Sequence, residues 1–439
     1  MFKETSKELL DFLSKSPTAF HAVENYRQIL NADGFKELLE SEHWDIVPGG
    51  KYYVTRNNTS ILAFKVGTKL DNYSFNIVTS HTDSPTFKVK ENAEIEVKNK
   101  YTQLNTEGYG GMLCATWLDR PLSIAGRVLV SEGNSIVTKL LNIDRDLLMI
   151  PNVAIHMNRA ANDGFKYNLQ VDMLPLLSAG DDRQKDFKQI IADELGVKKE
   201  DILGHDLYLY NRMAPSIWGA NEEFISSGHL DDLQCGFASL KALLAGYNDE
   251  SIDIMACFDN EEVGSGTKQG ADSTLLRDTL TRINNALGKT EEDYHRALAS
   301  SFMLSADNAH AVHPNHLEHT DVTNCTYMNE GVVVKSHAGQ KYTSDGVSMA
   351  VVKALASGAD VPLQYFANRS DKAGGSTLGN IAMAQASMNA VDIGLPQLAM
   401  HSSYETAGIK DTYYAISLMK ALFDSHIQET STHSLEIKR

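Results

Sequence analysis

Two adjacent glutamates, Glu261 and Glu262, follow shortly after an apolar, β-prone segment, Ile252–Phe258. A run of this length without glycine or proline is typical of a buried strand. In open α/β sheets, ligands bind just beyond the carboxyl ends of such strands. Because neighbouring residues of an extended chain point in opposite directions, one glutamate can hold a metal ion while the other faces a substrate. Taken alone, such a pair is more often a solvated acidic turn.

A histidine and an aspartate follow a second apolar strand. His81 and Asp83 come just after Ser74–Thr79, with one residue between them. The histidine can supply a nitrogen ligand, and the aspartate, which points the same way two residues later, can hold the imidazole in place. A hydrogen-bonded structural histidine explains the same pattern, so the pair indicates a metal site only together with other ligands.

Three further aspartates and a histidine stand beside predicted strands and helices. Asp231 and Asp232 lie in a glycine-containing loop before an apolar helix, where either could simply cap the helix. Asp307 and His401 each follow a short apolar segment. If these segments belong to one parallel or mixed sheet, their ends meet at a single edge.

The five candidate ligands that this edge would bring together are His81, Asp231, Glu262, Asp307 and His401. Three carboxylates and two imidazoles suit zinc, manganese or cobalt, and their number suits two ions that share one carboxylate. Two ions about 3.5–4 Å apart polarise a carbonyl and activate water at neutral pH. The water's proton then needs a base, and Glu261 is the neighbour placed to accept it. The sequence therefore predicts a dinuclear metal hydrolase.

The elements that must hold these residues form an α/β pattern with a β-rich block inside it. Apolar strands alternate with helices in both outer parts of the chain, whereas the middle has short strands and loops rich in glycine, proline and asparagine. We therefore expect a discontinuous catalytic domain, residues 1–90 and 226–439, and an inserted module, residues 91–225. Val153–His156 is expected to be one of the module's strands, and the polar residues from about Ile427 are expected to fray.

The composition excludes several classes of partner. The chain has 439 residues, which is enough for two or three domains. Its net charge of −17 argues against nucleic acid or an anionic membrane surface as a partner. The four cysteines are scattered, so neither a disulfide framework nor a cysteine-type zinc site is expected. The sequence has no apolar run of about 18 residues and no signal-peptide pattern, so the expected compartment is the cytoplasm.

Six stretches of the chain carry a more specific signal. They are SHTDSPTFKVK (80–90), IPNVAIHMNR (150–159), SGHLDDL (227–233), FDNEEVGSG (258–266), LSADNAHAVHPNH (304–316) and LPQLAMHSSYETAG (395–408). With these stretches, the chain resembles the aspartyl aminopeptidase family of dinuclear zinc metallopeptidases over nearly its whole length. The resemblance implies an α/β catalytic domain, a three-layer sandwich with a mixed central sheet. It also identifies the β-rich block as an inserted dimerisation domain.

The resemblance further implies a role for each candidate residue. His81 is expected to be a metal ligand that Asp83 orients, and Asp231 is expected to bridge the two ions. Glu261 resembles the family's general base. Asp232 stands where relatives often have asparagine, so it is expected to be a neighbour of the site. The remaining metal ligands are expected to be Glu262, Asp307 and His401.

His156, in the inserted block, matches a family histidine that reaches the active site of a neighbouring subunit. It is sometimes counted as a zinc ligand, but we expect it to contact the substrate because the five other ligands already complete the pair. Relatives assemble dimers into tetrahedral dodecamers with enclosed active sites, which restricts their substrates to short peptides. The resemblance therefore implies a homo-oligomeric aminopeptidase that acts on short peptides.

A preference for an N-terminal aspartate or glutamate would need a cation in the pocket for the first side chain. The stretches NRSDKAGGSTLG and HSSYETAG, near the substrate, depart from the family's usual forms, so this preference stays open. Two alternative functions are a related metal hydrolase acting on acyl-amino acids and a non-catalytic assembly protein that retains the metal shell. The candidate cations are Lys335, Lys341, Arg369 and Lys372.

Overall fold

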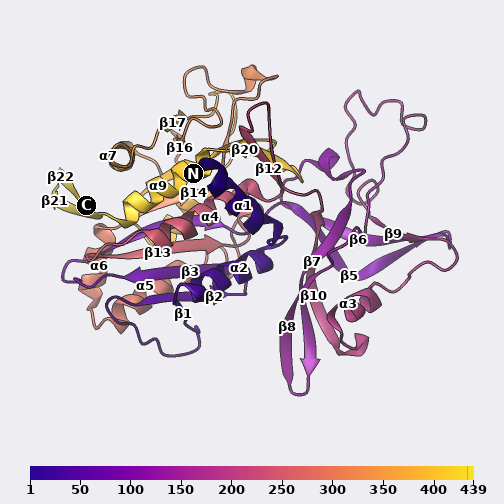
Figure 1. Ribbon diagram of the computed structural model, residues 1–439, viewed down its shortest axis with the longest axis horizontal. Helices are drawn as coiled ribbons and strands as arrows, with labels where there is room; N and C mark the ends of the chain where they lie inside the picture. Colours follow the sequence, from indigo (N-terminus) through magenta and orange to yellow (C-terminus); the bar gives the residue numbers. More distant parts are fainter. Residues whose placement is uncertain (433) are drawn as a thin grey trace.

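A nine-stranded mixed sheet forms the middle layer of the larger body of the protein (left in Figure 1). The computed structural model describes residues 1–432 and 434–439. In order across the sheet, the strands are β1 (Lys36–Glu37), β2 (Lys51–Arg56), β3 (Ser60–Val66), β13 (Ser251–Phe258), β4 (Ser74–His81), β14 (Phe302–Ala306), β18 (Asn389–Gly394), β16 (Val332–Lys335) and β17 (Leu363–Phe366). β13, β4, β14 and β18 run parallel to one another. β3 runs antiparallel to β13, and β16 runs antiparallel to β18.

Helices cover both faces of this sheet. One face carries α1 (Phe2–Ser14), α2 (Ala19–Ala32), α4 (Leu230–Ala245), α7 (Gly346–Ala359) and α9 (Asp411–Phe423), and the other carries α5 (Leu275–Ala286), α6 (Glu291–Ala299) and α8 (Leu378–Gln385). Along β13, Met255 and Cys257 pack into the first layer, whereas Ile254, Ala256 and Phe258 pack into the second, because successive side chains of a strand point to opposite faces. The expected three-layer sandwich with a mixed central sheet is confirmed. No helix among the described residues is both long and apolar enough to cross a membrane.

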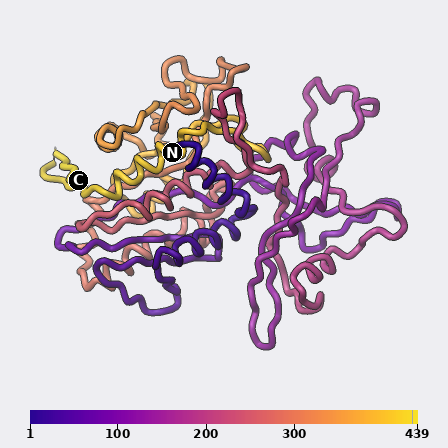
Figure 2. Tube along the Cα trace, viewed as in Figure 1, coloured from indigo at the N-terminus to yellow at the C-terminus, as the bar shows by residue number. Residues whose placement is uncertain are grey.

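A separate six-stranded antiparallel sheet, called the second sheet below, stands beside this body (right in Figure 1, and in the same view in Figure 2). In sheet order its strands are β8 (Ser135–Asn142), β7 (Leu122–Glu132), β10 (Ile202–Asn211), β5 (Thr86–Val97), β6 (Tyr101–Tyr109) and β9 (Leu176–Ala179), and α3 (Phe187–Leu195) packs with it. It has a core of its own, which includes Trp117 and Leu207, and a separate core is typical of an inserted module. The domain boundary at 91–225 stays a prediction.

Residues 216–227 leave that sheet and pair with strands from the C-terminal part of the chain. Ser227 pairs with Glu405 at one end of the β12–β20 ladder. This pairing places the loop that carries His401 beside the segment that leads into α4. The five strands, in sheet order, are β11 (Ser216–Trp218), β12 (Phe224–Ser227), β20 (Glu405–Gly408), β19 (Pro396–Leu398) and β15 (Ala309–His310).

Two expectations about local structure differ from the fold. Val153–His156 lies in a loop with turns, and not in a strand, because its side chains are exposed and no neighbouring strand covers them. The C-terminal residues, expected to fray, form a hairpin of β21 (His426–Ser431) and β22 (Ser434–Lys438). Ile427 belongs to the core of the first helical layer, and Ile437 packs against that core, so apolar burial holds the hairpin in place.

Asp253 is a buried carboxyl group in β13. Its Oδ1 accepts hydrogen bonds from Asn76 Nδ2 at 3.1 Å and Ser251 Oγ at 3.0 Å, and burial raises its pKa from 3.8 to about 8. Between these values the folded chain holds a proton that the unfolded chain releases, so Asp253 makes the free energy of unfolding fall as the pH rises.

We expect Asp253→Asn, which stays neutral, to gain stability relative to the wild type as the pH rises from about 5 to about 8. Urea unfolding at both pH values measures this gain. The exposed change Asp45→Asn is the control. An equal gain at both pH values for Asp253→Asn would contradict the assignment.

Candidate active site

Three strands of the central sheet bring their carboxyl ends to one place. β13 runs parallel to β4, with Phe258 opposite His81, and β4 runs parallel to β14. The residues that follow these strands therefore emerge at the same edge of the sheet. His81 ends β4, Asp307 follows β14, and Glu261 and Glu262 begin a short 3₁₀ turn after β13.

His81 is held between two aspartates. It is 1% exposed, and its Nδ1 lies 3.0 Å from the carbonyl oxygen of Asp83 and 3.4 Å from Asp83 Oδ1. On the other side of the ring, Nε2 lies 3.4 Å from Asp231 Oδ1. When Nδ1 donates its hydrogen to Asp83, Nε2 carries the lone pair and can bind a metal ion beside Asp231.

His401 faces the other oxygen of the same aspartate. Its Nε2 lies 3.6 Å from Asp231 Oδ2 and 3.3 Å from Glu262 Oε1, and its Nδ1 lies 2.7 Å from the carbonyl oxygen of Gly111. A buried carboxylate, Glu405, ties the main chains of both ligands together. It accepts hydrogen bonds from the amide of His401 at 2.8 Å and from the amide of Asp231 at 3.0 Å.

Glu405 was not identified from the sequence pattern. Its only sequence signal is its place in the stretch HSSYETAG. The backbone of His401 is left-handed, with φ of +65°, a conformation that costs a non-glycine residue about 1–2 kcal/mol. The hydrogen bond to Glu405 helps to hold this strained loop in place.

Asp231 belongs to two groups of potential ligand atoms, each with all its atoms within 4.8 Å of one another. Its Oδ1 and the Oε1 of Glu262 are buried and have no hydrogen-bond partner among the described residues. Buried carboxylate oxygens without a partner are costly unless a cation or a proton compensates them. Nitrogen and oxygen donors of this kind fit a borderline divalent ion such as zinc. The two groups are His81, Asp231 and Asp307, and Asp231, Glu262 and His401.

Glu261 stands beside both groups, and one of its oxygens lies within 4.8 Å of potential ligand atoms of His81 and Glu262. Burial raises the pKa of Glu261 to about 8; Asp307 and Asp83 also raise it, and His81 opposes them. Cations among these carboxylates would lower that pKa again. A carboxyl group whose pKa lies near neutral pH is suited to accept a proton in one step and return it in the next.

The two remaining aspartates of the predicted set face the main chain around the ligands. The oxygens of Asp83 accept hydrogen bonds from the amides of Glu261 and Glu262, both at 3.1 Å. Asp232 Oδ2 accepts a hydrogen bond from the amide of His81 at 3.2 Å, and Asp232 belongs to neither ligand group. Both side chains therefore hold the backbone that carries the candidate ligands.

A cavity of about 180 Å³ lies over the ligand groups. Lys335, at the end of β16, lines it and is 4% exposed. Its Nζ donates to the carbonyl oxygen of Asn308 at 2.8 Å and lies 3.5 Å from Asp307 Oδ1. The other candidate cations lie elsewhere: Lys341 donates to the carbonyl oxygen of Gly374, Arg369 pairs with Asp371, and Lys372 is exposed.

His156 lies away from this cavity within the chain. It is exposed on the long loop between β8 and β9 (upper right in Figure 1). Met157 and Val171 on the same loop are 78% and 70% exposed, and exposed apolar side chains on one loop favour a role in an interface. A contact of His156 with the substrate of a neighbouring subunit stays a prediction.

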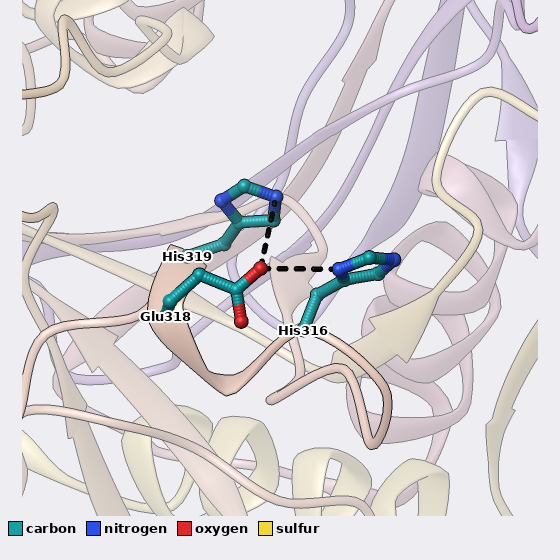
Figure 3. Close-up of side chains that lie close together, drawn as sticks. All are labelled: His316, Glu318 and His319. Atoms are coloured by element: carbon teal, nitrogen blue, oxygen red, sulfur yellow. Dashed lines mark hydrogen bonds and ion pairs between the residues drawn. The ribbon is translucent and has the colours of Figure 1, made fainter.

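A separate group of possible metal ligands lies on the surface. Figure 3 shows His316, Glu318 and His319 close together, with Glu318 Oε1 at 3.1 Å from His316 Nδ1 and 3.9 Å from His319 Nε2. More than half of each side chain is exposed. This group shares no residue with the two groups around Asp231, so a count of metal ions at the candidate active site must exclude it.

One known protein family matches most of the chain. The sequence profile of the aminopeptidase I zinc metalloprotease (M18) family matches residues 12–423. The chain belongs to the M18 family. It is accordingly a metalloaminopeptidase, and the resemblance found from the six sequence stretches is confirmed at the level of this family.

Relatives of this M18 protein match over nearly their whole length. A probable M18 family aminopeptidase 2 of Clostridium novyi is 48% identical over 425 residues, which cover 95% of this chain and 98% of that protein. Among solved structures, one chain of the Ape4 and Nbr1 complex has a TM-score of 0.92 and 35% identity, and the match covers 96% of this chain and 86% of that one. The mApe1 dodecamer of S. cerevisiae has a TM-score of 0.83 and 27% identity, with 96% and 97% covered.

Proposed function

We propose that this M18 protein binds two zinc ions and releases the N-terminal residue of short peptides. The observation that carries the proposal is the position of Asp231 between two ligand groups. Asp231 would bridge the ions, with His81 and Asp307 on one side and Glu262 and His401 on the other. When bound, such ions supply Lewis acidity to the scissile carbonyl and to the attacking water.

The chain's own residues then orient the ligands and move the proton. Asp83 holds the ring of His81 through Nδ1 and holds the main chain of Glu261 through its amide. Glu261 accepts a proton from the attacking water at its carboxylate and returns it to the nitrogen of the leaving amine. Since the carbonyl carbon gains the water oxygen as the bond to nitrogen breaks, one amino acid and one shortened peptide result.

We infer that Lys335 gives the first side-chain pocket a preference for aspartate or glutamate. Of the four candidate cations, it is the one that lines the cavity. A buried ammonium group binds a carboxylate through a charge-assisted hydrogen bond worth about 1.5–3 kcal/mol. The ammonium group of Lys335 lies near Asp307 and the carbonyl oxygen of Asn308, so the same lysine would also support a metal ligand.

Lys335→Met is expected to lower kcat/KM for peptides with N-terminal Asp or Glu by about 10- to 100-fold relative to peptides with N-terminal Leu or Ala. The measurement is a scan of the zinc-loaded protein against all N-terminal residues. Because the ratio compares two substrates of one enzyme, a loss of metal in the variant cancels. The exposed change Lys372→Met is the control, and an unchanged ratio for Lys335→Met would show that another group sets the preference.

The same scan separates the alternatives. A hydrolase of acyl-amino acids would cleave substrates with a blocked amine as well as free ones. An assembly protein would hold zinc without turnover of any peptide. Activity that requires a free α-amine supports the aminopeptidase.

We also infer that the chain forms a homo-oligomer built from dimers, as a tetrahedral dodecamer. The similarity to the mApe1 dodecamer supports this inference, and so does the apolar surface of the loop between β8 and β9. In such an assembly His156 would approach a neighbouring active site.

A further inference from the structure

A segment at the end of β6, in the second sheet, contacts groups that hold the ligands of the proposed zinc centre. Tyr109 ends β6, and Gly110 and Gly111 follow it. The hydroxyl group of Tyr109 donates to Asp83 Oδ2 at 2.7 Å. The carbonyl oxygen of Gly111 lies 2.7 Å from His401 Nδ1. One short segment thus contacts groups on both sides of the centre.

The surrounding hydrogen bonds fix the direction of the Tyr109 hydroxyl group. Asn260 Nδ2 donates to this hydroxyl oxygen at 2.8 Å. Asn260 Oδ1 accepts from Thr267 Oγ1 and from Gln269 Nε2, both at 2.8 Å, and turning the amide over would set two NH₂ groups, those of Asn260 and Gln269, against each other. Since the hydroxyl oxygen already accepts from Asn260, its own hydrogen points to Asp83.

Asp83, which Tyr109 holds, in turn contacts the catalytic residues. It is 5% exposed, its oxygens accept from the amides of Glu261 and Glu262 at 3.1 Å each, and its Oδ1 lies 3.4 Å from His81 Nδ1. The contact with Tyr109, at 2.7 Å, is shorter than these three. Loss of the Tyr109 hydroxyl would therefore leave one oxygen of Asp83 with one donor fewer, and the carboxylate would be free to tilt.

Gly110 and Leu113 bring the segment against the other half of the centre. A Cβ atom at Gly110 would lie 3.1 Å from the Cβ of Glu262, and the φ of Gly110 is +75°, so this close approach requires glycine. The amide of Leu113 donates to the carbonyl oxygen of His401 at 3.0 Å. The loop of His401 is thus held through its ring by Gly111 and through its main chain by Leu113.

We propose that Tyr109–Leu113 is a positioning segment through which the second sheet orients the catalytic centre. Tyr109 sets the carboxylate of Asp83, and Gly111 and Leu113 set His401. The second sheet then takes part in catalysis in addition to any role in assembly. The proposal rests on the proposed function, because it assigns the segment to the support of that zinc centre.

The test compares Tyr109→Phe with Tyr208→Phe in the full-length, zinc-loaded protein. Tyr208 lies on β10 and packs edge to face against Tyr109 at a ring-centroid distance of 5.8 Å, so each variant loses one hydroxyl group and keeps its ring. We expect Tyr109→Phe to lower kcat by about 10- to 100-fold, the effect typical of groups that hold metal ligands. KM is expected to stay within about twofold of the wild type, and Tyr208→Phe is expected to keep both constants within about twofold.

Zinc affinity, measured by competition with a chelator, is a second readout that needs no substrate. We expect it to fall about tenfold or more in Tyr109→Phe and to change little in Tyr208→Phe. The proposal is wrong if both kcat and zinc affinity of Tyr109→Phe stay within about twofold of the wild type, or if Tyr208→Phe loses as much. A wild-type protein that binds zinc but cleaves no peptide would count against the proposed function, and zinc affinity would still decide the role of Tyr109.

Discussion

Replacing Glu261 with glutamine is expected to lower kcat about a thousandfold, within the range of about 10²–10⁴ that general acid–base catalysis contributes, while zinc stays bound. Glutamine has nearly the same shape as glutamate but cannot accept the proton of the attacking water. Glu261 forms a group of potential ligand atoms with His81 and Glu262, but it belongs to neither of the two groups that share Asp231. Because all five ligands of the proposed centre remain, the variant should retain the metal. Its amide still donates to Asp83, because the substitution leaves the main chain unchanged.

Two measurements on one sample decide this prediction. The rate on a peptide that the wild type cleaves is compared with zinc content by elemental analysis. Glu291→Gln, the same chemical change on the exposed surface of α6, is the control and is expected to match the wild type in both. If Glu261→Gln cleaves at close to the wild-type rate, Glu261 is not the base. If it loses zinc in proportion to activity, Glu261 is a ligand.

The positions of three ligands were predictable because His81, Glu262 and Asp307 each follow an apolar strand of the central sheet. The expectation that the same sheet edge would carry the other two ligands is wrong, since Asp231 and His401 follow β12 and β19 of the five-stranded sheet. Buried strands of this kind belong to a sheet whose parallel members end at one edge, and the pairing of Phe258 with His81 shows that edge directly. The alternation of apolar residues likewise gave most of the central strands and the helices on both faces. Such patterns are local and can be recognised in one sequence.

The groups that support the ligands could not be predicted in this way. Glu405 contacts the amide of Asp231, which lies 174 residues earlier in the chain, and Tyr109 contacts Asp83 only because β6 pairs with β5. The first contact joins segments that are distant in sequence, and the second depends on the register of the β5–β6 hairpin, which shifts between Val89 and Glu94. Alternation within one strand specifies neither the neighbouring strand nor its register. The C-terminal hairpin was missed for a related reason, since its few apolar residues are stabilised by a surface that other segments build.

Asp231→Asn should remove both zinc ions, whereas Asp307→Asn should weaken only one of them. In the proposed centre Asp231 takes part in both ligand groups and Asp307 in one. Asparagine keeps the shape of the side chain, and the main-chain amide of residue 231 still donates its hydrogen bond to Glu405. The main change is therefore the loss of a negative charge between two cations. We expect close to no zinc per subunit in Asp231→Asn and about one in Asp307→Asn, measured after dialysis against zinc-free buffer.

His319→Ala, introduced into every protein of the series, removes the exposed group of Figure 3 from the count. Circular dichroism and thermal unfolding confirm that each variant is folded before its zinc is counted. A loss of only one ion in both aspartate variants would contradict a bridging role for Asp231. A loss of both ions in both variants would show instead that the second ion does not bind without the first. If Asp231→Asn retains all of its zinc, Asp231 is not a ligand that both ions need, and the proposed dinuclear centre is wrong.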